Sequence, residues 1–205
     1  MLGDGITEHA TIFPGFGKLF SQSAKIMENM PAHASEEDLK YPIGRYQAPT
    51  VISADQRAAW IEEMAKLPLN LNNAVAGLND AQLDTPYRPG GWTIRQVVHH
   101  LPDSHMNSYM RFRLALTENV PLIKPYDEGA WANLSDARTA PIAASLAMLE
   151  GLHTRFVLLL KSLSDADFAR TFRHPELGER RLDWTLGLYA WHSLHHVAHI
   201  NNTKR

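Results

Sequence analysis

Residues 183–200 read DWTLGLYAWHSLHHVAHI, an apolar stretch that carries four histidines within eight positions. Asp183 is a residue type that often caps a helix N-terminus, so we expect the last helix to begin there. Successive residues of an α-helix are about 100° apart, which brings side chains four positions apart to within about 40°. His192 and His196 therefore share one face of this helix, and His195 and His199 form a second such pair less than a quarter turn away.

The segment 52–78 predicts a long helix. Ser53 and Gln56 have the spacing of a capping box, and apolar residues then recur on one face. These are Trp60, Met64, Leu67, Leu71 and Val75. Because proline removes a backbone hydrogen bond, we expect Pro68 to kink or divide the helix.

Two further helices are expected between this segment and the last one. The first starts at Thr93, where Gln96 completes another capping box, and extends through residues 98–118. The second begins near Pro141, a favoured first helical position, and continues through 146–163.

The connecting segments are rich in turn residues. Residues 84–91 and 119–129 predict loops from their proline and glycine content, and residues 171–183 predict a short hairpin around a glycine-containing turn. Four long helices joined in this way predict an all-α fold, a four-helix bundle with a short hairpin before the last helix. Such bundles build metal sites from side chains on facing helices.

Charge excludes two classes of partner. The 205 residues carry 20 Lys and Arg against 22 Asp and Glu, for a net charge of −2, and the basic residues are scattered along the chain. Nucleic acids and anionic membranes are bound by clustered positive charge, so we expect neither as a partner. No apolar run approaches the roughly 20 residues of a membrane helix.

The chain contains no cysteine, so any metal site must use imidazole, carboxylate or carbonyl ligands. The lack of thiols and of a recognisable secretory signal favours the cytoplasm. Residues 1–40, rich in Gly, Ser, Pro and Met, are expected to form a loosely attached extension or to precede the true start. Residues 41–205 are expected to form the bundle domain.

The histidines predict a metal site. An i,i+4 pair of imidazoles can share one divalent cation, but the glutamate of the HExxH protease motif is missing. Catalytic sites commonly use three protein ligands, and a third histidine is available in HHLPDSH, which contains His99, His100 and His105. The spacing of the histidines in the sequence does not show which of them bind the metal. The clusters could instead form a protonatable dimer seam or an adventitious metal-binding surface.

Several longer motifs carry a family resemblance. GGWTIRQVVHHLPDSHMNSYMRFRLALTE (90–118) resembles the signature helix of the DinB-like superfamily, in particular its YfiT-type branch. YPIGRY, LDTPYRPGG, KPYDEGAW and LYAWHSLHHVAHI resemble the same branch, in order and at suitable separations. The resemblance spans about residues 41–200 and leaves out the first forty.

The resemblance implies a four-helix bundle that binds one divalent ion, zinc or nickel, through three histidines. In these proteins one ligand follows the Trp of GGWT by eight residues, which selects His100, and the HxxxH pair selects His192 and His196. His195 and His199 then lie around the ligands or pack. Pro102, just after His100, departs from the expected pattern and should bend that helix.

The site suits two reactions. An ion held by three neutral imidazoles lowers the pKa of bound water toward about 7, and it also stabilises a thiolate. Proteins of this branch are described as metal-dependent hydrolases, and related DinB-like members transfer thiols such as bacillithiol. We expect a hydrolase acting on a small molecule, with thiol transfer or a non-enzymatic metal-binding or structural bundle as alternatives. We also expect a homodimer, and we assign no side chain as a catalytic acid or base.

Four side chains are weaker candidates for the site. Asp103, one turn beyond His100, could orient an imidazole, because ligand histidines often donate to a carboxylate. Tyr126 and Asp127, in the KPYDEGAW motif, could line the pocket mouth. His153 could face either the bundle interior or the solvent.

Overall fold

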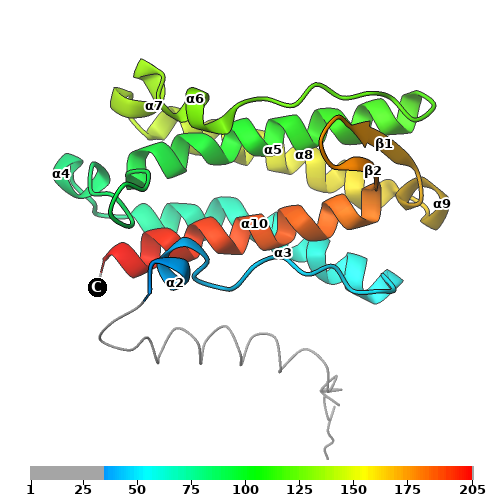
Figure 1. Ribbon diagram of the computed structural model, residues 1–205, viewed down its shortest axis with the longest axis horizontal. Helices are drawn as coiled ribbons and strands as arrows, with labels where there is room; N and C mark the ends of the chain where they lie inside the picture. The colour runs from blue at the N-terminus through cyan, green and yellow to red at the C-terminus, as the bar shows by residue number, and fades with distance from the viewer. Residues whose placement is uncertain (1–34, 205) are drawn as a thin grey trace, which may run out of the picture. The chain divides into compact units, whose positions relative to one another are not determined.

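The computed structural model describes residues 35–204, and the residues from Glu36 onward form one compact unit (Figure 1). Its long helices are α3 (Ala54–Val75), α5 (Ile94–Thr117), α8 (Ala143–Ser162) and α10 (Leu182–Thr203). The predicted four-helix bundle is confirmed. Residues 1–34 of the predicted extension lie outside the described residues, and Glu36–Lys40 form the short helix α2.

The four long helices pack in a ring. Helix α3 packs against α8 and α10, and α5 packs against the same two helices, so α3 and α5 occupy opposite corners. Figure 1 shows α5 running alongside α10. This arrangement brings His100 and His105 of α5 next to His192 of α10.

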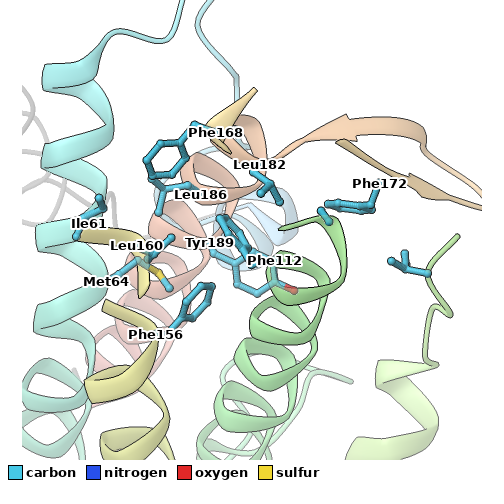
Figure 2. Packing of buried hydrophobic residues seen from close by; sticks show 12 residues of the cluster. Ile61, Met64, Phe112, Phe156, Leu160, Phe168, Phe172, Leu182, Leu186 and Tyr189 are labelled. Atoms are coloured by element: carbon cyan, nitrogen blue, oxygen red, sulfur yellow. The ribbon is translucent and has the colours of Figure 1, made fainter. Parts of the chain in front are cut away.

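The core consists of two apolar clusters. One contains Met64, Phe112, Phe156 and Leu186, which converge from all four long helices in Figure 2. The other is built around α5 residues 94–101 and also includes Leu67, Leu149 and Ile200. Along α10 the first cluster ends at Tyr189 and the second is reached at Ile200. The four histidines of α10 lie between these positions.

Two of the predicted helix starts agree closely with the structure. Ser53 Oγ accepts from the Gln56 backbone N–H at 3.1 Å. The Thr93–Gln96 capping box is complete, with reciprocal distances of 3.2 and 2.9 Å. These caps satisfy backbone N–H groups that have no partner within the helix.

Neither internal proline divides its helix. Helix α3 continues through Pro68 and α5 through Pro102. Of the two outcomes expected at Pro68, a kink or a division, the division does not occur. Pro68 leaves the Met64 carbonyl without its usual helical donor. That carbonyl is instead 2.7 Å from His153 Nδ1, which replaces the lost hydrogen bond from another helix.

The expected cap at Asp183 is also wrong. The predicted hairpin is present as the antiparallel strands β1 (Thr171–His174) and β2 (Gly178–Arg181), and β2 leads directly into α10. The N-cap is therefore Arg181, which makes no side-chain cap hydrogen bond. Asp183 lies in the first turn, is buried, and pairs with the Arg181 guanidinium at 2.6 Å.

The connections contain short helices that the periodicity did not indicate. They are α4 (Asp80–Leu83), α6 (Glu128–Ala132), α7 (Ser135–Thr139) and α9 (Asp165–Phe168). Helix α8 begins at Ala143, shortly after the predicted start at Pro141. Each of the four has only four or five residues, too few for a helical period to stand out.

The apolar character of α8 exceeds the sequence expectation. An 18-residue window of this 20-residue helix has a mean hydropathy of 1.3, so the helix is long and apolar enough to cross a membrane by length and composition alone. The core helix of a bundle meets the same test. Here α8 packs against α3 and α5 and buries Leu149, His153, Phe156 and Leu160.

Gly187 allows α10 to approach α3 closely. A Cβ at this position would lie 2.7 Å from a ring carbon of Trp60 and closer still to the Tyr46 hydroxyl. We expect Gly187→Ala to lower the free energy of unfolding by about 1–3 kcal/mol through overpacking, measured by urea denaturation.

A matched control is available on α8. A Cβ at Gly151 would meet nothing within 4 Å. Alanine has the higher helix propensity, so Gly151→Ala should raise stability by up to about 1 kcal/mol. Equal effects of the two substitutions would contradict the close packing of α10 on α3.

Candidate metal centre

Three imidazoles meet at the interface of α5 and α10. His100 comes from α5, and His192 and His196 lie one turn apart on α10. The Nε2 atom of His192 is 3.2 Å from that of His100 and 3.1 Å from that of His196. One ligand atom from each of the three lies within 4.8 Å of the others. The structure thus brings together the three histidines that the resemblance selected.

The spacing of these nitrogens fits a divalent cation. Zinc–imidazole bonds of about 2.0–2.1 Å in tetrahedral geometry separate two ligand nitrogens by about 3.3 Å. The 3.1 and 3.2 Å separations are close to this value. Imidazole nitrogens without carboxylate or thiolate neighbours also match the ligand preference of zinc and nickel.

Burial keeps these imidazoles in their metal-binding form. Burial lowers the pKa of His100 to about 4. The pKa values of His192 and His196 lie well below the usual value, first because of burial and then because of the neighbouring imidazoles. All three are therefore neutral at pH 7, each with one nitrogen lone pair available as a ligand.

The same shifts predict how stability depends on pH. In the unfolded chain a histidine titrates near pH 6.5, whereas burial lowers the pKa of His100 and His153 to about 4. Between these values the unfolded chain binds more protons, so stability falls as the pH falls from about 6.5 toward 4. Each such histidine contributes up to about 1.4 kcal/mol per pH unit in this window. Urea denaturation of metal-free protein at pH 7.5, 6 and 5 measures the effect, and a flat profile would contradict it.

The other two histidines of α10, His195 and His199, lie beside the triad formed by His100, His192 and His196. His195, His196 and His199 form a second group whose ligand atoms lie close together. His199 Nε2 is 3.2 Å from the Lys40 carbonyl, and its Nδ1 is 3.4 Å from His196 Nδ1. Both ring nitrogens of His199 thus have partners, which makes this group the weaker candidate for a cation. His195 stacks on Trp191 with ring centroids 4.4 Å apart.

The triad faces a cavity of about 1030 Å³, near the upper end of the range for small-molecule sites. Tyr126 and Asp127 line it, as the sequence suggested, together with Trp92 and Tyr189. Charged side chains of both signs line the cavity; these are Lys40, Arg88, Arg111, Asp127, Glu128 and Glu176. The cavity is therefore electrically mixed, with no field that selects strongly for one sign of ligand.

Two other residues that the sequence suggested for the site, Asp103 and His99, do not hydrogen-bond the triad through their side chains in the described part of the chain. Asp103 makes no side-chain hydrogen bond to an imidazole within residues 35–204, so it does not orient a ligand there. Burial, followed by repulsion from Asp136, raises the pKa of Asp103 to about 6. His99 hydrogen-bonds Ser145 Oγ and the Ala140 carbonyl, away from the triad.

Sequence reasoning missed the place of two histidines. His105 and His153 are buried and extend from His192 in a chain of ring-to-ring contacts. His105 was available in the HHLPDSH motif, but its spacing from His100 does not indicate a contact with α10. His153 is a single histidine on an apolar helix, and the sequence left open whether it faces the bundle interior or the solvent.

A four-helix bundle with buried, neutral imidazoles converging on a cavity is the architecture of a metal-binding bundle protein. The DinB superfamily profile matches residues 64–200. The chain belongs to the DinB superfamily.

Close relatives are found among bacilli. The protein is 53% identical over 169 residues to a Bacillus subtilis (strain 168) protein named "Putative metal-dependent hydrolase YfiT", covering 82% of this chain and 95% of the relative. A Bacillus cereus (strain 03BB102) protein with a similar name is 54% identical over 168 residues, covering 82% and 96%. The solved structure of Bacillus subtilis YfiT, described as a probable metal-dependent hydrolase with an unusual four-helix bundle topology, superposes with a TM-score of 0.80 over 82% of this chain and 97% of that one.

Proposed function

We propose that this protein is a metal-dependent hydrolase of small molecules, with one divalent ion held by His100, His192 and His196. The observation that carries the proposal is the convergence of three imidazole Nε2 atoms at one side of the cavity. The names of the relatives support hydrolysis, and none of them refers to thiol transfer.

The chemistry of such a site follows from its ligands. A divalent ion bound by neutral imidazoles keeps its full charge, polarises an electrophile and lowers the pKa of coordinated water toward about 7. The chain supplies the surroundings. Trp92 packs on His100 with ring centroids 4.8 Å apart and limits the positions of that ring. Trp92 and Tyr189 provide apolar walls for a substrate.

Tyr126 provides a neutral hydrogen-bond donor in the cavity. A tyrosine hydroxyl is protonated at neutral pH, and burial raises the pKa of this phenol further. It can therefore donate a hydrogen bond to a substrate oxygen. The mixed charges that line the cavity favour a polar substrate of small net charge over a polymer.

The finer assignments belong to the same proposal. We infer that zinc is the resident metal, with nickel as the alternative, since both bind imidazole readily. We further propose a homodimer in the cytoplasm that has no nucleic-acid or membrane partner. The absence of cysteine supports the cytoplasm, and the near-neutral charge argues against nucleic-acid and membrane partners.

An activity panel tests the proposal. Metal-free protein, prepared without a polyhistidine tag, is assayed against esters, amides and lactones before and after addition of zinc or nickel. We expect hydrolysis only with metal, lost in His100→Ala and retained in His99→Ala. The matched pair removes neighbouring buried histidines of α5, of which only His100 belongs to the triad.

A second arm tests the competing reaction. The metal-loaded protein is incubated with monochlorobimane and bacillithiol, glutathione or cysteine. Metal-dependent conjugation that requires one of these thiols, without hydrolysis of the panel, would replace the hydrolase with an S-transferase. Metal binding without either activity would leave a metal-binding bundle.

A further inference from the structure

Two buried histidines, His105 and His153, connect His192 in a line to a backbone carbonyl of α3. His192 Nδ1 lies 3.2 Å from His105 Nε2, and His105 Nδ1 lies 3.0 Å from His153 Nε2. His153 Nδ1 lies 2.7 Å from the Met64 carbonyl oxygen. His105 is fully buried and His153 is 2% exposed, so water does not compete for these contacts. The line joins α10, α5, α8 and α3.

The end of the line fixes its direction. A carbonyl oxygen can only accept, so His153 Nδ1 must carry the proton that it shares with Met64. This carbonyl is available because residue 68, its usual helical donor, is proline. A neutral imidazole carries one N–H, so the Nε2 atom of His153 accepts from His105 Nδ1–H.

The same reasoning reaches the triad. Once His105 donates from Nδ1, its Nε2 accepts from His192 Nδ1–H. The remaining nitrogen of His192, Nε2, then presents its lone pair to His100 and His196. Burial supports the neutral state of His153, because it lowers the pKa of that imidazole to about 4.

A shorter line ends at the other ligand of α10. His199 Nε2 donates to the Lys40 carbonyl, so its Nδ1 accepts from His196 Nδ1–H. His196 then also presents an Nε2 lone pair, 3.1 Å from that of His192. Two lone pairs at this distance repel each other, and a cation between them turns the repulsion into two bonds.

We propose that His105 and His153 are positioning residues that hold His192 in the tautomer whose Nε2 is free to bind the metal. This role rests on the proposed metal centre. The line carries no proton to solvent, because it ends at a buried carbonyl that cannot be protonated at neutral pH. Its effect is to orient the His192 ring and to fix its tautomer before the metal arrives, as hydrogen-bond partners of ligand histidines commonly do.

The tautomers can be read directly by NMR. Long-range 1H–15N spectra of protein labelled with 15N-histidine distinguish Nδ1–H from Nε2–H rings. In metal-free protein at pH 7.5 we expect His105, His153 and His192 all to carry the proton on Nδ1. An Nε2–H tautomer at His105 or His153 would overturn the proposal whether or not the protein hydrolyses anything.

Metal affinity provides the second readout. We expect His105→Leu to weaken zinc binding by about 10–100-fold in chelator competition, with His192 losing its single Nδ1–H tautomer. His105→Gln keeps a carbonyl acceptor toward His192 and an amide donor toward His153. It should therefore restore most of the affinity. His99→Leu, which removes another buried and hydrogen-bonded histidine of α5, should leave the affinity unchanged.

The outcomes separate this role from packing and from the proposed function. If His105→Leu and His99→Leu weaken zinc binding equally, or if His105→Gln restores nothing, the positioning role is wrong. If His105→Leu fails to fold, the zinc affinity of His105→Gln and the histidine tautomers of the wild type still test the positioning role. Tautomers and affinities as expected, with no hydrolysis, would leave the positioning role in place and refute only the hydrolase.

Discussion

Zinc binding is expected to be lost when either His192 or His196 is replaced by alanine. Each substitution removes one of the three ligands, and the Nε2 atom of His192 lies 3.2 Å from that of His100 and 3.1 Å from that of His196. Changes around the ligands typically weaken metal binding 10–100-fold, so loss of a ligand should exceed about a hundredfold. Isothermal titration of metal-free protein with zinc, backed by chelator competition, measures the loss.

The other pair on α10 provides the matched control. His195 makes no hydrogen bond to a triad imidazole within residues 35–204, so His195→Ala should leave affinity nearly unchanged. His199 contacts His196 Nδ1, so His199→Ala should fall between the two. If His195 and His199 prove essential while His192 and His196 are dispensable, the metal is bound by the neighbouring face of α10 instead.

Metal should also stabilise the fold strongly. Ligand that binds only the folded state adds RT ln(1 + [L]/Kd), about 4 kcal/mol when free zinc is a thousandfold above Kd. For a chain of this size each kcal/mol shifts the melting temperature by roughly 2–4 °C, so we expect an increase of about 8–16 °C. The proposed site gives this gain a structural cause, since a cation bound there would join two imidazoles of α10 to one of α5.

Calorimetry with and without a chelator tests this effect. His100→Ala should melt close to metal-free protein and respond little to zinc, because it retains only the two ligands of α10. A melting temperature that zinc does not change in the wild type, or one that rises equally in His100→Ala, would contradict a site that joins the two helices.

Much of the fold was predictable because local physics decides it. The periodicity of 52–78 and the capping box at Thr93 and Gln96 involve residues that are neighbours in sequence, and the structure shows the same elements. The i,i+4 relation of His192 and His196 is equally local. Choosing His100 over its neighbour His99 required the family resemblance, because both are buried on α5.

The rest depends on contacts between distant segments. The sequence around Asp183 is typical of a helix cap. Strand β2 continues directly into α10, however, and this makes Arg181 the N-cap. Pro68 reads as a helix breaker until His153, from another helix, takes the carbonyl that the proline frees. The line from His105 to Met64 passes through three helices, and no spacing within one of them indicates it.

X-ray absorption at the zinc edge tests the central claim most directly. In protein loaded with one equivalent of zinc, we predict three imidazole nitrogens at about 2.0–2.1 Å, and one fewer imidazole in His100→Ala. His99→Ala should give the same spectrum as the wild type. A shell with fewer than three imidazoles, or one that His100→Ala leaves unchanged, would contradict a metal centre built from His100, His192 and His196.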